Sequence, residues 1–363
     1  MSSYTSSSNP HRRYVLWLLA LAFALMTGLF SLGVYLQPLF GDLTRIGSYA
    51  ERDYGWNKPQ LEFQQPLFEM GRYDRYYDVV VLGDSFSTER PRFQWQNYLV
   101  AAKGWSVVTL DRKKIKLEQV LENPVFRKTP PKIFILETVE RGLPGLIAIN
   151  QPCDATALLK RVDATARPEA VAAPVHAREL QGLAKQVERE AAWHNIKLGY
   201  VRNYLLNSLL RKLFGDARTN AVNVELAEVA SFSSANKQSM LIYKDDFSKR
   251  PGWRKMSLPE ISCRIESMRR RVEENRQSRF VFMVAPDKLT AYADFVRDKK
   301  LRDISQLSEF SGYLPEIMPR LDLTLISAIH NGEQDVYLPD DTHWGSTGHQ
   351  IAAETLLTFL RNP

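Results

Sequence analysis

The stretch VVVLGDSFST, Val79–Thr88, decides the fold, because it joins an apolar run to a turn that carries a serine. The mostly β-branched run ends at Gly83 and is typical of a strand buried on both faces of a parallel sheet. The turn that follows presents Ser85 as a candidate nucleophile. A serine hydroxyl is weakly nucleophilic at neutral pH, so this hypothesis requires a base elsewhere in the chain. An ordinary turn after an ordinary strand is the alternative.

Further short apolar runs predict more strands of the same sheet. WSVVTL starts at Trp105, KIFIL at Lys132 and RFVFMVA at Arg279, and segments of helical length lie between them. Strands that alternate with helices indicate an α/β fold with a parallel sheet. The weaker runs MLIY at Met240 and LTLISAI at Leu323 are moderate strand candidates.

The interval from Pro152 to Asn236 breaks this alternation. It begins rich in alanine and proline and continues with helix formers, in which Leu205, Leu209 and Leu213 recur at four-residue spacing. We expect an inserted helical subdomain at about residues 152–236.

The N-terminal region predicts a membrane anchor. Residues 14–36 carry no charge, and a helix of that length covers the roughly 30 Å hydrocarbon core of a bilayer. A cleaved signal peptide usually has a shorter apolar region that ends at small residues, whereas the small residues here lie in the middle of the run. Arg12 and Arg13 precede the run, so residues 1–13 are expected in the cytoplasm and the rest beyond the membrane.

Composition excludes several classes of protein. The chain is 44% hydrophobic and 25% charged, and its formal charge of +7 is spread without a basic run, so nucleic-acid binding is not predicted. Cys153 and Cys263 allow one disulfide, and two separate buried thiols are the alternative. Without a CxxC or HExxH spacing, the sequence predicts no metal site and no cofactor.

The last quarter of the chain supplies the base. In YLPDDTHW, Asp341 lies two residues before His343 in a polar loop. Ser85, His343 and Asp341 would act as nucleophile, base and orienting carboxylate. Asp340 is the competing carboxylate, and His349 is an alternative histidine that we interpret as structural. The serine turn and this loop are expected to meet at the carboxyl edge of the sheet, where α/β folds place their sites.

GDSFS and DTHW resemble the first and last blocks of the SGNH/GDSL hydrolase superfamily. More narrowly, they resemble membrane-anchored SGNH-like proteins related to alginate O-acetyltransferases. The resemblance implies a flavodoxin-like α/β/α domain with a Ser-His-Asp triad, held in the periplasm by a single-pass inner-membrane helix. It also implies acetyl transfer to an exported polysaccharide, with a membrane-bound O-acyltransferase as the partner that supplies acetyl. The expected organisation is a cytoplasmic N-terminus (1–13), an anchor (14–36), a connector (37–74) and an SGNH-like domain (75–363) that contains the insertion.

The chain departs from these families at two points. The serine precedes the Asp-x-His pair, the reverse of the order in the alginate enzymes, which a triad defined by geometry tolerates. The Gly-x-Asn-Asp block that gives an oxyanion donor is replaced by ETVERG. Arg141 is therefore a candidate oxyanion or substrate contact, with an ion pair to Glu137 or Glu140 as the alternative. Asp84 and Trp344 are further substrate or oxyanion candidates, with sugar stacking as the expected contact of Trp344 and core packing as its alternative, and Lys288 could face the same cleft.

The leading hypothesis is an O-acetyltransferase that works through an acetyl-serine. A polysaccharide acetylesterase with the same triad is the first alternative, because the two reactions differ in whether water is the acceptor. A non-catalytic, membrane-anchored glycan-binding or assembly factor is the second.

Overall fold

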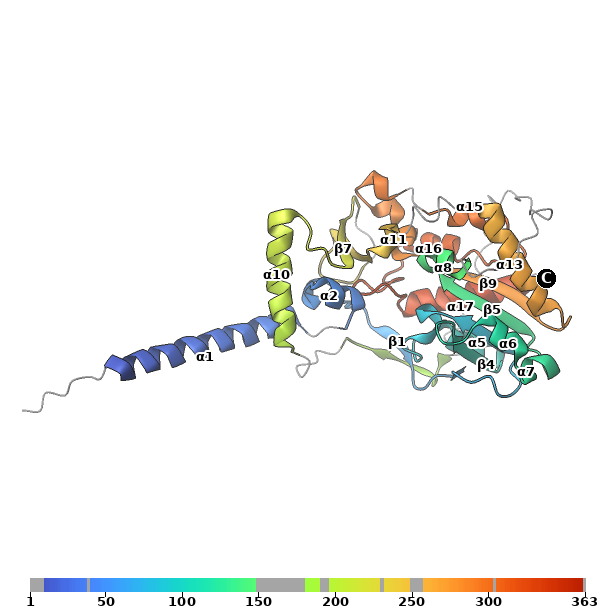
Figure 1. Cartoon of the computed structure of the whole chain (residues 1–363), viewed down its shortest axis with the longest axis horizontal. Coiled ribbons are helices and arrows are strands. Elements are labelled where there is room, and N and C mark those ends of the chain that lie inside the picture. The colour runs from blue at the N-terminus through green and yellow to red at the C-terminus, as the bar shows by residue number, and fades with distance from the viewer. Residues whose placement is uncertain are drawn as a thin grey trace, which may run out of the picture.

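A computed structural model shows an α/β domain preceded by a long helix that extends away from it (Figure 1). Cys263 is disulfide-bonded, and its expected partner Cys153 lies outside the described residues. The structure describes residues 10–37, 40–147, 180–189, 196–228, 232–248, 257–302 and 305–361.

The centre of the domain is a five-stranded parallel sheet in the order β2-β4-β3-β5-β9. The predicted strands at residues 79, 105, 132 and 279 are therefore confirmed. The order β4-β3-β5-β9 matches a flavodoxin-like sheet, whose strand order reverses between β3 and β5, and such reversals are where ligands bind. The strands are β2 (Glu69–Met70), β3 (Val79–Gly83), β4 (Val107–Asp111), β5 (Ile133–Val139) and β9 (Arg279–Ala285).

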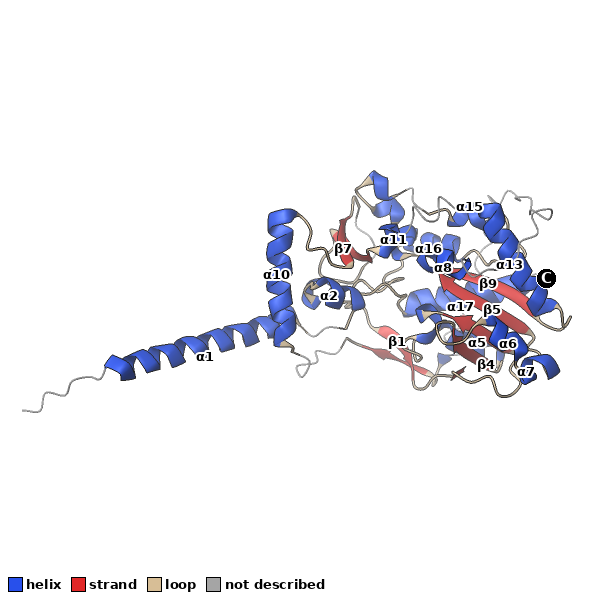
Figure 2. Ribbon diagram, in the orientation of Figure 1, coloured by secondary structure: helices blue, strands red, loops and turns tan. Residues whose placement is uncertain are grey.

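Helices cover both faces of this sheet (Figure 2). Successive side chains of a strand point to opposite faces, so Val79 and Val81 enter one hydrophobic core while Val80 and Leu82 enter the other. The result is the expected α/β/α sandwich. One layer contains α5 (Trp95–Lys103), α16 (Leu321–His330) and α17 (Ser346–Arg361), and the other contains α6 (Leu117–Glu122), α7 (Pro124–Lys128), α8 (Leu143–Ile147), α13 (Leu258–Glu273) and α15 (Leu307–Ser311).

One strand prediction was wrong and one needs correction. LTLISAI belongs to helix α16, because Leu321, Leu325 and Ile329 recur every four residues and all are buried. MLIY does form a strand, β8 (Ser239–Tyr243), but it pairs antiparallel with β7 (Ala221–Glu225) outside the central sheet.

The region predicted as a helical insertion is mixed in the part that the structure describes. It contains the 17-residue helix α10 (Leu198–Phe214), the strand β7, and the strand β6 (Ala184–Val187). Strand β6 pairs antiparallel with β1 (Gln60–Phe63), which comes from the predicted connector. Two short helices, α2 (Asp42–Gly47) and α3 (Glu51–Tyr54), precede β1.

Helix α1 (Pro10–Leu36) is long and apolar enough to span a membrane, and it has this property alone among the described helices. Its first two thirds are exposed, whereas Leu36 is buried against Val201 of α10 and Ala50. The remaining described helices are α4 (Ser85–Thr88), α11 (Asp245–Ser248), α14 (Lys288–Ala291) and 3-10 turns at Glu140–Gly142, Ala293–Phe295 and Lys299–Leu301.

Candidate active site

The candidate nucleophile lies where β3 ends and α4 begins. Ser85 is half-buried and is the first residue of α4, and the Asp84 side chain caps this helix by accepting from Phe86 N at 3.1 Å. Gly83 allows the turn to pass close to β5. A Cβ at Gly83 would lie 2.6 Å from Glu137 Oε2, so a larger residue would push the turn away.

The side chain of Asp84 also holds the serine turn in place through hydrogen bonds. Its Oδ2 accepts from Val139 N at 2.8 Å and from Arg112 Nη2 at 3.1 Å, and the residue is 3% exposed. These bonds tie the end of β3 to the ends of β4 and β5. The carboxylate that the sequence offered as a substrate or oxyanion contact is thus occupied by protein donors.

Glu137 is a second carboxyl under the same turn, and sequence reasoning missed its part there. Its Oε2 accepts from Asp84 N at 2.9 Å and from Ser87 Oγ at 2.8 Å. Burial raises the pKa of Glu137 well above its usual range, and the nearby Asp84 charge adds to this. Through these two hydrogen bonds Glu137 anchors the serine turn on β5.

The candidate base and carboxylate contact each other directly. His343 Nδ1 lies 2.8 Å from Asp341 Oδ1, and Arg90 Nη2 donates to Asp341 Oδ2 at 2.9 Å. Asp340 has other surroundings, where burial and the charges of Glu51 and Asp341 raise its pKa. Of the two aspartates, Asp341 is therefore the one that contacts the imidazole of His343.

The surroundings of His343 suit a general base. Burial lowers the pKa of His343, but the Asp341 charge and hydrogen bond outweigh burial, so the net pKa is raised. Burial raises the pKa of Asp341, but the charge and hydrogen bond of His343, with the Arg90 charge, hold it below its usual range. With Nδ1 donating to Asp341, Nε2 is the proton acceptor, an assignment that follows from the hydrogen-bond pattern.

The serine turn and the histidine loop meet through Phe86. Its ring centroid lies 4.9 Å from that of His343 and 4.9 Å from that of Trp344. Because Phe86 follows Ser85 in the chain, this contact joins the serine turn to the histidine loop. Within the described residues, Nε2 of His343 has no hydrogen-bond partner, so the Ser85–His343 bond is not formed here. Such bonds often tighten only when substrate binds.

Lys288 braces the histidine loop from inside the protein. Its Nζ donates to the carbonyl oxygens of Leu338 at 2.8 Å, Pro339 at 3.0 Å and Asp341 at 3.1 Å. Burial lowers the pKa of Lys288 to about 8, although the charges of Asp340 and Asp341 oppose this. All the protons of the ammonium group are therefore used to hold the loop, and Lys288 does not offer them to a substrate.

Arg141 lies in a buried ion cluster. Its Nη1 is 2.6 Å from Asp287 Oδ1 and 3.3 Å from Asp246 Oδ1, and its guanidinium lies 5.3 Å from the ring centre of Tyr243. These partners differ from Glu137 and Glu140, which the sequence suggested. Asp246 and Asp287 lie far from Arg141 in the sequence, so local spacing could not identify them as its partners.

Trp344 and His349 are two buried residues close to His343. Trp344 is 2% exposed and packs at 5.5 Å against the ring of His349, so its ring is not a surface on which a sugar stacks. Burial, together with the charges of His343 and Arg90, lowers the pKa of His349 to about 3. His349 is therefore neutral. A small cavity in front of these residues is lined by Glu89, Arg90, Phe93, Gln94, His343 and Trp344, among others.

One group of described side chains has the spacing of metal ligands. Oxygen and nitrogen atoms of Asp42, Asp341 and His343 lie within 4.8 Å of one another. Both oxygens of Asp341 already accept from His343 and Arg90, and Asp42 pairs with Arg45. Ion pairs within the chain thus account for this group.

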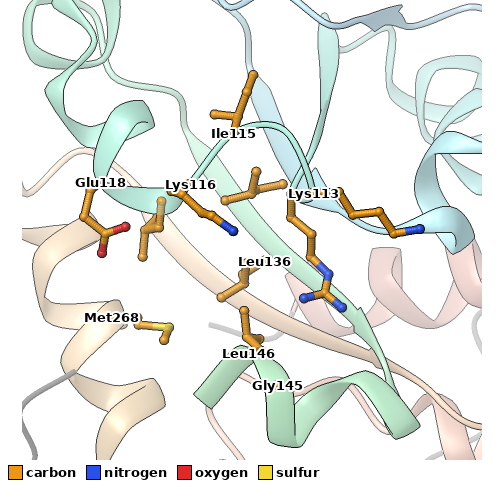
Figure 3. A pocket seen from close by; sticks show the side chains of 11 residues that line it. Lys113, Ile115, Lys116, Glu118, Leu136, Gly145, Leu146 and Met268 are labelled. Carbon is orange, nitrogen blue, oxygen red and sulfur yellow. The ribbon is translucent and has the colours of Figure 1, made fainter. Parts of the chain in front are cut away.

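A second cavity lies on the other face of the sheet (Figure 3). Its lining includes the apolar side chains of Leu82, Leu136 and Met268 and the basic residues Lys113 and Lys116. Leu82 and Leu136 belong to the core opposite the one that contains Phe86 and Trp344. The sheet therefore separates this cavity from the candidate active site.

The sheet order defines an α/β protein with a flavodoxin-like parallel sheet. Residues 241–363 match the family model described as the SGNH hydrolase-like domain of acetyltransferase AlgX. The match confirms the predicted resemblance to relatives of alginate O-acetyltransferases. It contains β9, Lys288 and the Asp341–His343 pair, whereas Ser85 precedes it. No curated protein and no solved structure matched the chain.

Proposed function

We propose that the protein is an O-acetyltransferase that carries acetyl on Ser85 and passes it to hydroxyl groups of an exported polysaccharide. The observation that supports this most is the Asp341–His343 pair, whose Nε2 makes no hydrogen bond within the described residues and lies 3.8 Å from Glu89 Oε2, while the imidazole ring packs against Phe86, the residue that follows Ser85. The match to an acetyltransferase family model favours acetyl as the group transferred.

In the first half-reaction, Ser85 Oγ attacks the carbonyl carbon of an acetyl donor while His343 Nε2 takes the hydroxyl proton. Asp341 keeps Nδ1 protonated and stabilises the imidazolium. The intermediate collapses to acetyl-Ser85, and the imidazolium returns its proton to the leaving group of the donor. The backbone N–H of Ser85 is the first candidate donor to the oxyanion.

In the second half-reaction, a sugar hydroxyl replaces the donor. His343 takes its proton, the sugar oxygen attacks acetyl-Ser85, and Ser85 Oγ leaves with the proton from His343. Transfer requires that the acceptor reach the ester before water does.

The location follows from α1. We place α1 in the inner membrane as a single-pass anchor with the α/β domain in the periplasm, because Arg12 and Arg13 lie at its N-terminal end. A domain held at the membrane could receive acetyl from a membrane-bound O-acyltransferase, which we propose as the partner.

An acetylesterase is the second candidate. The same three residues would serve it, and it is favoured because Ser85 is only half-buried.

The test uses the full chain in lipid nanodiscs with a chromogenic acetyl ester, with and without an oligosaccharide acceptor. Acetylated oligosaccharide that forms with the wild type and not with Ser85→Ala would support the transferase. Ser327→Ala, on the exposed side of α16, is the matched control. Acetate release that ignores the acceptor would identify an esterase. Equal turnover by Ser85→Ala and wild type would refute the triad.

A further inference from the structure

Helix α10 exposes a continuous apolar face. It runs from Leu198 to Phe214, and the exposed fractions of its outer side chains range from 38% at Leu210 to 74% at Phe214. A surface helix of a globular protein usually turns such a face inward. The exposed apolar residues are Leu198, Leu205, Leu206, Leu209, Leu210, Leu213 and Phe214.

The opposite face of α10 binds the α/β domain through polar contacts. Tyr200 Oη donates to Tyr49 O, Asn207 Nδ2 donates to Ser48 Oγ at 3.0 Å, and Arg211 Nη1 donates to Ser48 O at 3.3 Å. These three residues recur at helical spacing on one stripe. The leucines at 205, 209 and 213 occupy the stripe on the far side, so the apolar face points away from the domain.

Helix α10 also packs on the last turns of α1. Leu29, Leu32 and Leu36 of α1 lie in one apolar cluster with Val201 of α10. Gly33 permits this approach, because a Cβ there would lie 2.6 Å from Ile196 Cγ2. Figure 1 shows α10 running across the end of α1 instead of along it. If α1 crosses a bilayer, α10 therefore lies along the surface of that bilayer.

The charges of α10 fit the same position. Residues 198–214 contain no aspartate or glutamate, and Arg202 and Lys212 are exposed basic residues, whereas Arg211 is bound to the domain. An amphipathic helix with basic residues and a leucine-rich face is the type that binds anionic lipid surfaces.

We infer that α10 is an interfacial helix whose leucine face is embedded in the surface of the membrane that α1 spans. This inference rests on the proposed function only in taking α1 as the anchor. The inference has a consequence for the candidate active site, because α2 connects α10 to the loop that carries Asp341 and His343. Helix α10 binds residues 47–49 at the end of α2, and Leu43 N at its start donates to Asp340 O at 3.0 Å. Docking of α10 therefore holds the Asp341–His343 loop close to the bilayer.

The test places a nitroxide at Leu209 through Leu209→Cys in the full chain. The matched control is Lys128→Cys on α7, an exposed residue at the end of the domain remote from α1 (Figure 1). Because Cys263 is disulfide-bonded, the introduced thiol is the one that reacts. Collision rates with oxygen, which enters lipid, and with a nickel chelate, which stays in water, are measured in nanodiscs that contain phosphatidylglycerol.

The inference predicts a high oxygen and low nickel rate at residue 209, at a depth of about 5–10 Å, with the reverse at residue 128. A nickel rate at residue 209 equal to that at residue 128 would show that the face lies in water and would overturn the inference. Low rates with both reagents would show cover by protein, a partner or a second copy, and would also overturn it. None of these readouts depends on Ser85, so failure here is separable from failure of the proposed function.

Discussion

His343 Nδ1 lies 2.8 Å from Oδ1 of Asp341, two residues earlier in the chain, and Arg90 closes the other oxygen of that carboxylate. The short loop thus fixes the tautomer and the orientation of the imidazole by itself. The rest of the fold has to hold this loop in place, and the contacts of Lys288 and Phe86 with the loop do so.

Asp341→Asn should nearly abolish turnover while Asp340→Asn should not. Arg90 donates to the side-chain oxygen away from His343, so the amide oxygen of the variant stays with Arg90 and its NH2 group faces Nδ1. The NH2 group cannot accept from Nδ1–H, so Nε2 carries the proton in much of the population and kcat falls by about 10⁴. Steady-state kinetics of both variants check this. Equal losses in the two variants would mean that the orienting carboxylate has been misassigned.

Activity should rise with pH through the titration of His343. The base works only when neutral, and the net effect of its surroundings raises the pKa of His343 above 6.5. The acidic limb of kcat/KM should therefore have its midpoint above 6.5, and Glu89→Gln should move it to lower pH, since the charge of Glu89 also raises this pKa. A midpoint below 6.5, or none between pH 5 and 9, would argue against His343 as the base.

Lys288→Met should impair both stability and catalysis. The change leaves the carbonyl groups of Pro339 and Asp341 without their donor, at a cost of about 1–3 kcal/mol for each group left unsatisfied, while Leu338 O keeps its bond from Asp341 N. Thermal unfolding gives the stability loss. Because the loop carries the base, kcat should fall more than KM rises in the fraction that remains folded. Unchanged kcat in that folded fraction would mean that Lys288 contributes to stability alone and not to catalysis.

Glu137→Gln should stabilise the protein at neutral pH. Burial and the Asp84 charge raise the pKa of Glu137, so folding favours the protonated form and stability falls as pH rises from the ordinary value toward the raised one. Glutamine removes this dependence and keeps an oxygen for Asp84 N and Ser87 Oγ. Denaturant unfolding at pH 5 and pH 8 should show a gain over wild type that grows with pH. A loss at pH 8 would indicate an ionised Glu137.

The central strands could be predicted because buried parallel strands are continuously apolar, and Val79–Gly83 shows this most clearly. The loop around His343 was predictable because its acid and base are neighbours in the chain. LTLISAI, which belongs to helix α16, was predicted as a strand because its apolar residues fit the two-residue spacing of a strand as well as the four-residue spacing of a helix. The contacts of Glu137, Lys288 and Arg141 were not predictable, since each depends on partners that only the tertiary fold brings together.

The most direct test of the account is the detection of acetyl on Ser85. Wild-type protein would be incubated with the acetyl ester, quenched rapidly and digested. The mass of the peptide that contains Ser85 would then be measured by mass spectrometry. The account predicts a peptide heavier by one acetyl group, whose signal disappears when an oligosaccharide acceptor is added before quenching. Acetylated oligosaccharide formed at the wild-type rate by Ser85→Ala, with no acetyl found on the wild-type peptide, would contradict it.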